Sequence, residues 1–293
     1  MSDLLASLTP LAGGHSGRTF VGEAGGERVV VRLYPPDADH APETDAAVLA
    51  LVRGLLPVAE VLEVRRGDAA SGQPGLLVTS WLPGERGDLV VDQLDEDGLA
   101  RLGAAMGHVA GTLAGMPMRH AGPYVDAELT LGRFPEGGLV EWVESRLAAW
   151  SDSDRARLSR VAAPAQELLD AAGRACLVHS DLNPKNVLVD PLTGEITGLV
   201  DWEFAHAGHP WTDLGNVLRF DRNDAYVGAA LAAWVGLRGG TVAEVLDGAR
   251  AADLWALVDL AARSGENPVA TRAEGLLRTI AATGELHAWP SGT

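Results

Sequence analysis

The first eighty residues contain short apolar runs separated by glycine, aspartate and serine, a pattern typical of strands and turns. A β-branched run at 27–33 ends at two prolines, and further apolar runs follow at 58–64 and 75–78. Between the first two runs, residues 44–56 favour a helix. The pattern therefore predicts a small, β-rich N-terminal region that contains one helix.

Beyond Pro83 the apolar positions change to a helical period. Between Leu99 and Leu113 they recur at steps of three and four, which places them on one helix face. Further helices are expected at 139–150 and at 154–172, with the second interrupted or bent at Pro164 because proline lacks a backbone N–H. This part of the chain is therefore predicted to be mainly helical.

The C-terminal third combines two short strands with more helices. Apolar runs at 187–190 and 196–200, joined by a turn, favour paired strands. From Trp211 onward the period is helical, and Thr241 with Glu244 forms a capping-box pattern at a helix start. The simplest fold class is α+β, with a small β-rich lobe followed by a larger helical lobe.

The boundary between the two lobes is expected where the pattern changes. Residues 1–82 would form the N-terminal lobe, and 85–293 the helical lobe. The segment TSWLPG, at 79–84, would be the hinge between them. A site that uses residues from both lobes would then lie beside this hinge.

Composition and charge narrow the classes of partner. The chain has 293 residues, of which 47% are hydrophobic, enough for one large core or two moderate ones. Forty acids against 23 bases give a net charge of -17, which would repel a nucleic-acid backbone or an anionic membrane surface. Counted along the sequence, residues 1–85 carry -5 and the remainder -12. Neither nucleic acid nor membrane is expected as a partner, and a cationic small molecule is favoured.

Cysteine usage and the N-terminal segment bear on the compartment. The single cysteine, Cys176, cannot form an internal disulfide, which suits a reducing environment. The N-terminal residues lack the basic region of a signal peptide. The longest nearly apolar run, 225–237, is shorter than the roughly 20 residues that a membrane span needs. We therefore expect a cytoplasmic protein.

The basic residues are unevenly divided, because all but one of the 23 are arginine. The exception is Lys185. Any mechanism that requires a particular lysine must therefore use Lys185 or do without one.

One stretch concentrates polar residues in a pattern that carries chemistry. An apolar, strand-like segment leads to His179 and Asp181, Asn186 follows five residues after Asp181, and the paired strands then lead to Asp201. This order matches the kinase catalytic loop H-x-D-x-x-x-x-N followed by a metal-binding aspartate. Asp181 could orient a substrate hydroxyl, while Asn186 and Asp201 offer the hard oxygen ligands that Mg²⁺ prefers.

The segments HSDLNPKN and LVDWE resemble the Brenner-type motif of the aminoglycoside phosphotransferase family. Relatives of that family include choline, ethanolamine, homoserine and macrolide kinases, and their fold is similar to that of protein kinases. The resemblance implies a two-lobed, protein-kinase-like fold and an ATP- and Mg²⁺-dependent small-molecule phosphotransferase. An aminoglycoside-like acceptor is the best single expectation, and a kinase of another small metabolite or antibiotic is the alternative.

Carried onto this chain, the resemblance assigns roles to individual residues of the motif. Asp181 would be the catalytic base or hydroxyl-orienting residue, with Asn186 and Asp201 as magnesium ligands. His179 would support the loop, and Asp213 would brace the fold. In addition, Ser180 replaces the glycine that is usual between the histidine and the aspartate, and Glu203 is a candidate to support the metal site or hold a substrate amine.

The resemblance also predicts a nucleotide site on the N-terminal lobe. Arg32 stands where a kinase has its strand lysine, and its helix partner would be Asp45, with Glu43 as the alternative. Backbone groups at 80–82 would bind adenine, and Trp81 could stack on the base or pack at the lobe junction. The residues of this site are Arg32, Asp45, Gly13, Gly14 and Gly17 of a phosphate-binding loop, and Ser80, Trp81 and Leu82 of the hinge.

Competing interpretations of the same region are less favoured. His206 and His209 with Asp213 could be a zinc site, although the spacing of a zinc-binding helix is missing. Cys176 beside His179 could be a nucleophile and base, but a small apolar cysteine is the simpler interpretation. A nucleotide-binding protein with a kinase fold and no transfer activity remains a second class.

Overall fold

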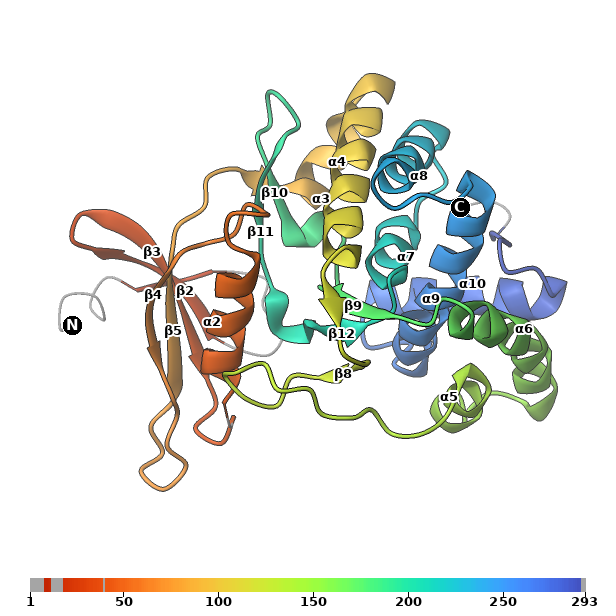
Figure 1. The fold of residues 1–293 in the computed structure, drawn as a ribbon, viewed down its shortest axis with the longest axis horizontal. Helices are drawn as coiled ribbons and strands as arrows, with labels where there is room; N and C mark the ends of the chain where they lie inside the picture. The colour runs from red at the N-terminus through yellow and green to blue at the C-terminus, as the bar shows by residue number, and fades with distance from the viewer. Residues whose placement is uncertain (1–7, 12–17, 39, 291–293) are drawn as a thin grey trace.

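The computed structural model of the chain describes residues 8–11, 18–38 and 40–290. Figure 1 shows a β-sheet with one helix at the N-terminal end and a larger group of helices built from the remainder. The predicted α+β class, with a small β-rich part before a larger helical part, is therefore confirmed.

The N-terminal sheet is antiparallel throughout, in the order β1-β2-β3-β5-β4. Its strands are β1 (Thr9–Pro10), β2 (Arg18–Ala24), β3 (Glu27–Tyr34), β4 (Val61–Arg65) and β5 (Gly75–Ser80). Side chains alternate along β3: Val29 and Val31 are buried in a small apolar cluster on one face. Arg32 and Tyr34 belong to the opposite face, where Tyr34 joins the main core. The alternation thus directs the side chain of Arg32 toward the rest of the molecule.

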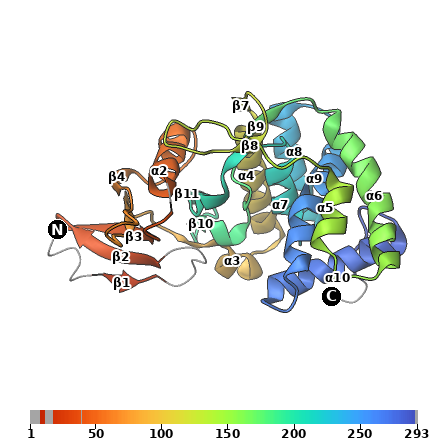
Figure 2. The same ribbon diagram turned by 90° about the horizontal axis from the view of Figure 1, so that it is seen from below.

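Helix α2 (Ala41–Val52) covers that second face of the sheet. Pro42 lies in its first turn, where a missing N–H costs nothing. The helix ends before the expected residue 56 because Arg53 adopts an extended backbone conformation. In Figures 1 and 2, α2 lies between the N-terminal sheet and the central part of the molecule. This places acidic residues of α2 beside the face of β3 that carries Arg32.

The remaining helices form the larger part of the molecule. They are α3 (Gly87–Val90), α4 (Glu96–Ala114), α5 (Leu139–Arg146), α6 (Asp152–Asp170), α7 (Thr212–Leu218), α8 (Asp224–Arg238), α9 (Val242–Ala262) and α10 (Pro268–Thr283). Short 3-10 turns occur at η1 (Val91–Gln93), η2 (Pro184–Asn186) and η3 (Trp202–Phe204). Of the interruption or bend expected at Pro164, the interruption is wrong, because α6 runs through this residue as one helix that packs on α5, α9 and α10. The capping box of Thr241 and Glu244 is present at the start of α9.

Helices α4 and α8 approach each other closely along a row of glycines. A Cβ atom at Gly103 would lie 2.2 Å from the carbonyl oxygen of Tyr226, and one at Gly107 would lie 2.1 Å from that of Ala230. Any larger residue would therefore push the helices apart. This close contact fixes the position of α4 against α8 in the helical part.

Two small sheets lie between the N-terminal sheet and the helices. One has the order β11-β10-β6, from β6 (Glu85–Arg86), β10 (Val187–Val189) and β11 (Ile196–Leu199). The other has the order β7-β9-β12-β8, from β7 (Pro117–Met118), β8 (Gly122–Pro123), β9 (Ala175–Val178) and β12 (His206–Gly208). The short strand β12 was not expected, since its three residues HAG carry no alternation of apolar and polar side chains.

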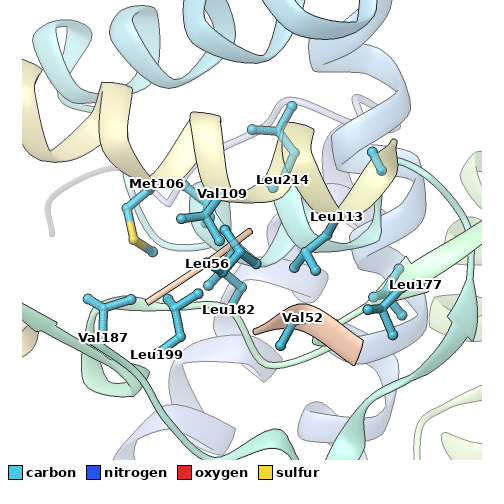
Figure 3. Packing of buried hydrophobic residues seen from close by; sticks show 14 of the residues in the cluster. Val52, Leu56, Met106, Val109, Leu113, Leu177, Leu182, Val187, Leu199 and Leu214 are labelled. Atoms are coloured by element: carbon cyan, nitrogen blue, oxygen red, sulfur yellow. The ribbon is translucent and has the colours of Figure 1, made fainter. Parts of the chain in front are cut away.

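The main core joins the N-terminal region to the helical part. Val52 and Leu56, from α2 and the loop after it, lie among apolar side chains of α4 and the central strands (Figure 3). The other residues labelled there are Met106, Val109, Leu113, Leu177, Leu182, Val187, Leu199 and Leu214. Because the cluster is continuous, the small sheets that surround it are held rigidly between both parts.

No single helix among the described residues is both long and apolar enough to cross a membrane. Helices α8 and α9 pass the criterion only as a pair, and they are bent by 102° relative to each other.

Candidate active site

The loop that follows β9 is anchored by apolar side chains on both sides of its polar residues. Leu177 and Val178 at the end of β9 are buried, and Leu182 within the loop is fully buried in the main core. Asp181 and Asn183, on either side of Leu182, are partly exposed. Burial of Leu182 therefore fixes the backbone while its polar neighbours face outward. Truncation of Leu182 to alanine would lower the free energy of unfolding by about 2–5 kcal/mol.

Two asparagine side chains hold the carboxylate of Asp181. The Nδ2 of Asn183 donates to Oδ1 of Asp181 at 2.8 Å, and the Nδ2 of Asn186 donates to Oδ2 at 2.8 Å. Both amides also donate to the backbone carbonyl of Asp181, at 3.0 and 2.9 Å. The carboxylate is thus oriented by neutral donors, which leaves its remaining lone pairs able to accept from a substrate hydroxyl.

Asn183 is a residue that sequence reasoning missed. Besides holding Asp181, it accepts a hydrogen bond from the N–H of Lys185 through its Oδ1 at 3.0 Å, and so caps the turn η2. The available signal was an asparagine directly before proline, a pair that favours a turn. Asn183 therefore couples the turn to the orientation of Asp181.

The hairpin of β10 and β11 brings Asp201 beside Asn186. Val187 pairs with Leu199, and the N–H of Val200 donates to the carbonyl of Asn186 at 3.0 Å. Asn186 precedes the first strand and Asp201 follows the second, so both lie at the open end of the hairpin. Asp201 adopts the left-handed backbone conformation, with φ of 66°. An amide and a carboxylate are therefore brought together from residues 15 positions apart in the chain.

His179 joins the loop to the segment that carries Asp201. Its Nε2 lies 3.0 Å from the carbonyl oxygen of Val200, which can only accept, so this nitrogen donates. Its ring also lies 4.5 Å, centroid to centroid, from that of Trp202. His179 is fully buried and so acts as an internal link and not as a surface group.

Asp213, at the start of α7, supports the same loop from within the core. Its carboxylate accepts from the backbone N–H of His179 at 2.9 Å and from that of Ser180 at 2.8 Å. Burial raises the pKa of the Asp213 carboxyl, while His179 and the two donating amides act in the opposite direction. Both oxygens of the Asp213 carboxylate are therefore used as acceptors by the loop backbone.

Ser180 adopts a backbone conformation that favours glycine. Its φ is 67°, which costs a residue with a side chain about 1–2 kcal/mol relative to the right-handed region. We expect Ser180→Gly to stabilise the folded protein by about 1 kcal/mol once the greater flexibility of unfolded glycine is included. Thermal unfolding would show this as a rise in Tm of about 1–2 °C. A fall in Tm would mean that the serine side chain stabilises the loop in a way that offsets the strain.

Arg32 reaches from β3 to the carboxylates around Asp201. Its Nη1 lies 3.3 Å from Oδ1 of Asp201, and its Nη2 contacts Oε2 of Glu203 directly. The expected partner Asp45 is more distant, with Oδ2 at 3.9 Å from Nη1, and accepts a hydrogen bond of 2.6 Å from the hydroxyl of Tyr34. The alternative partner, Glu43, instead pairs with Arg66 at 2.7 Å. Arg32 therefore links β3 mainly to the segment that follows β11.

Backbone amides of the segment predicted to be the hinge are partly used within the protein. The N–H of Ser80 donates to the carbonyl of Glu60 at 2.8 Å, and that of Trp81 donates to the carbonyl of Arg28 at 3.2 Å. The guanidinium of Arg28 also covers the Trp81 ring at 3.7 Å. In the part of the chain that the structure describes, the N–H of Leu82 has no hydrogen-bond partner. Gly13, Gly14 and Gly17 lie outside the described residues.

The zinc interpretation does not fit the structure. His206 contacts the carbonyl of Phe204 through Nδ1 at 2.8 Å, and His209 contacts that of Leu169 through Nε2 at 3.1 Å. Asp213 is engaged by the loop backbone, as described above. Within the described residues, no group of three or more His, Cys, Asp or Glu side chains could hold a metal ion.

The interpretation of Cys176 as a nucleophile also fails, because its side chain is fully buried. Burial raises the pKa of the thiol to about 12, so the reactive thiolate is absent near neutral pH. We expect the folded protein to resist a thiol-specific reagent at pH 8, and the unfolded protein to react with one equivalent. Rapid labelling of the folded protein would contradict this expectation.

Two tryptophans of the helical part contact arginines of the chain. The guanidinium of Arg146 lies 4.6 Å from the ring centre of Trp142, and that of Arg278 lies 4.3 Å from Trp150. Trp142 also donates from Nε1 to the carbonyl of Trp255 at 3.0 Å. These rings therefore have partners within the fold.

Comparison with known proteins agrees with this geometry. A sequence model of the phosphotransferase enzyme family, APH, matches residues 7–246. The structure is similar to that of aminoglycoside phosphotransferase APH(4)-Ia, with a TM-score of 0.65 and 20% identity over 96% of this chain and 94% of that one. A macrolide 2'-phosphotransferase, MphH from Brachybacterium faecium, gives a TM-score of 0.53 and 22% identity over 92% and 91%. These similarities confirm the expected two-lobed, kinase-like fold.

One shorter similarity concerns a larger protein. The chain is 34% identical over 55 residues to acyl-CoA dehydrogenase family member 11 of Mus musculus. The matched stretch is 19% of this chain and 7% of the mouse protein, so it covers only a small part of either.

Proposed function

The chain belongs to the phosphotransferase enzyme family and is a small-molecule kinase, and we propose that it transfers the γ-phosphoryl group of ATP to a hydroxyl of its acceptor. The observation that carries this proposal is the pair of asparagines, Asn183 and Asn186, that orient the carboxylate of Asp181. Phosphoryl transfer requires positioning and charge stabilisation more than covalent help from the protein. A fixed carboxylate next to hard oxygen ligands meets that requirement.

Asp181 is the residue that would act on the acceptor. Its carboxylate accepts a hydrogen bond from the acceptor hydroxyl, turns the oxygen toward the phosphorus atom, and takes the proton as the new bond forms. Asn183 and Asn186 keep the carboxylate in place throughout, because their amides remain donors whether or not the acceptor is bound. His179 and Asp213 hold the backbone on which this geometry depends.

The donor set at the open end of the β10–β11 hairpin fits Mg²⁺. Asp201 offers carboxylate oxygens, and Asn186 offers its amide oxygen because its Nδ2 is used on Asp181. Mg²⁺, when bound with the nucleotide, would neutralise charge on the phosphate oxygens. Arg32 would bind the phosphates beside it, and the N–H of Leu82 would bind the adenine edge at the proposed hinge.

For the acceptor, an aminoglycoside-like antibiotic is the best-supported class. The charge of the chain favours a cationic molecule, and the larger share of that charge follows residue 85. A solved structure of an APH(4)-Ia mutant is a ternary complex with AMP-PNP and hygromycin B, and its fold is similar to that of this chain at a TM-score of 0.64. Choline, ethanolamine, homoserine and macrolides are the alternative acceptors.

A second candidate function is nucleotide binding without transfer. The observation in its favour is the long separation of 3.9 Å between Arg32 and Asp45, where an active kinase is expected to have a close pair. The oriented Asp181 argues for the first candidate.

The test is acceptor-dependent release of ADP in the presence of ATP and Mg²⁺. The panel comprises aminoglycosides, macrolides, choline, ethanolamine, homoserine and a peptide, and nucleotide binding is measured in parallel by calorimetry. We expect binding of ATP and ADP release that rises with one class of acceptor and disappears when the divalent cation is removed. Binding without acceptor-dependent release would favour the second candidate, and absence of binding would exclude both.

A further inference from the structure

The arginine that replaces the strand lysine does not take its main partner from α2. Among the described residues, three carboxylates surround the guanidinium of Arg32: those of Asp45, Asp201 and Glu203. The contact with Glu203 is the closest of the three, and that with Asp45 is the longest, at 3.9 Å. The strongest charge contact of Arg32 therefore comes from the turn η3, which follows Asp201 directly.

Side-chain length explains why the helix residue is displaced. Aspartate is one methylene shorter than the glutamate that pairs with the strand lysine in protein kinases, and Asp45 accepts a 2.6 Å hydrogen bond from Tyr34. Tyr34 lies on the same face of β3 as Arg32, and its hydroxyl binds Oδ2 of Asp45, the same oxygen that lies 3.9 Å from Arg32. Asp45 is therefore a poor anchor for Arg32, and a second acid is needed nearby.

The two ends of the guanidinium have different partners. Nη2 contacts Glu203, whereas Nη1 lies 3.3 Å from Asp201, at the open end of the hairpin where the phosphates are proposed to lie. A planar guanidinium held at one end keeps its other end aimed in a fixed direction. A phosphate oxygen could thus replace Asp201 at Nη1 while the contact between Nη2 and Glu203 stays intact.

We propose that Glu203 is the positioning residue for Arg32 in nucleotide binding, and that it takes over the role expected of a carboxylate on α2. This inference rests on the proposed nucleotide-dependent function. It assigns to Glu203 neither a ligand bond to the metal nor a contact with the acceptor. Its action is exerted through Arg32 alone, so its effect on affinity should persist without a divalent cation and vanish without Arg32.

The sign of the effect separates positioning from simple repulsion. Glu203 is an acid beside a site for an anionic ligand, so removal of its charge by itself should strengthen ATP binding. If Glu203 positions Arg32, removal of its charge should instead weaken binding, because Arg32 loses its fixed direction. A weakened variant therefore cannot be explained by through-space electrostatics.

The experiment measures ATP affinity calorimetrically in EDTA, so that metal ligation cannot contribute. The variants are Glu203→Gln, Asp45→Asn as the matched control from α2, Arg32→Ala, and the double variant of Arg32→Ala with Glu203→Gln. We expect Glu203→Gln to raise the Kd for ATP about tenfold and Asp45→Asn about twofold, as is usual for coupled contacts. In the background of Arg32→Ala, Glu203→Gln should cause no further loss.

Several results would overturn the inference. These are unchanged or tighter binding by Glu203→Gln, a larger loss from Asp45→Asn, or an equal loss with and without Arg32. If Glu203→Gln does not fold, Glu203→Asp decides, since its shorter carboxylate should also weaken binding. If the wild-type protein binds no ATP with or without Mg²⁺, the proposed function itself fails. If the wild-type protein binds ATP and Glu203→Gln binds it with the same Kd, only this inference is refuted.

Discussion

Replacement of Asp181 with alanine is expected to lower kcat for phosphoryl transfer by about 10²–10⁴-fold, the usual contribution of a positioned acid or base. The reason is that no other described carboxylate is held by both Asn183 and Asn186. Binding of ATP should remain within about twofold of wild type, since Asp181 is assigned to the acceptor and not to the nucleotide. Initial rates of ADP release with a saturating acceptor, together with calorimetric affinities, measure the two effects separately.

A matched control for this variant is Asp190→Asn, at the closed end of the same hairpin. Asp190 accepts backbone N–H groups of the turn at Leu192 and Thr193, and an asparagine oxygen can do the same. It should therefore leave turnover unchanged. Turnover by Asp181→Ala that equals wild type would show that the acceptor hydroxyl is oriented elsewhere.

The second large effect is expected from Asp213→Ala, which removes the acceptor for two backbone amides of the proposed catalytic loop. The N–H groups of His179 and Ser180 would then lie beside a buried cavity without their carboxylate. Hydrogen bonds to a charged group contribute about 1.5–3 kcal/mol each, so the loss of stability should be about 3–6 kcal/mol. For a chain of this size that corresponds to a fall in Tm of about 5–10 °C.

Asp213→Asn provides the graded comparison. One oxygen of the asparagine side chain can still accept, but its amide group faces one of the two N–H donors. We therefore expect a Tm between that of wild type and that of Asp213→Ala. Both variants should also lower kcat, because Ser180 is held in its left-handed conformation next to Asp181. A Tm for Asp213→Ala within about 2 °C of wild type would mean that the loop is held by its apolar anchors alone.

Much of the secondary structure follows from local pattern. The run at 27–33 alternates on a half-buried strand, and the steps of three and four between Leu99 and Leu113 correspond to the buried face of α4. The strands around the turn after Asp190 were also predictable, because both are short apolar runs beside a glycine turn. These elements form wherever side-chain period and backbone preference agree.

Other features depend on contacts that a local pattern does not contain. The strand β12 forms because β8 and β9 lie on either side of it, not because of its own residues. The single helix α6 continues through Pro164 because it packs against three other helices. The partial displacement of Asp45 from Arg32 by Glu203 depends on the hydroxyl of Tyr34 and on the path of η3. The spacing of residues in the sequence alone does not predict where the Tyr34 hydroxyl or the turn η3 lies.

The order of His179, Asp181, Asn186 and Asp201 indicated the chemistry of the site before its geometry was known. The structure adds how the residues are held: Asn183 and Asn186 orient Asp181, and Asp213 holds the backbone. The lone Lys185 has no ion pair among the described residues, and the cation that faces Asp201 is Arg32. The single lysine of the chain thus lies in the loop after β9, whereas the cation beside the proposed phosphate site is an arginine.

The most direct test of the account is transfer of the γ-phosphoryl group to the acceptor. ATP labelled at the γ-phosphate is incubated with Mg²⁺, the protein and the acceptor that gives the highest ADP release, and the products are separated and examined by phosphorus NMR. We expect an O-phosphate ester on the acceptor with wild-type protein, and its near absence with Asp181→Ala. Label that remains in ATP, or appears only as inorganic phosphate, would contradict it.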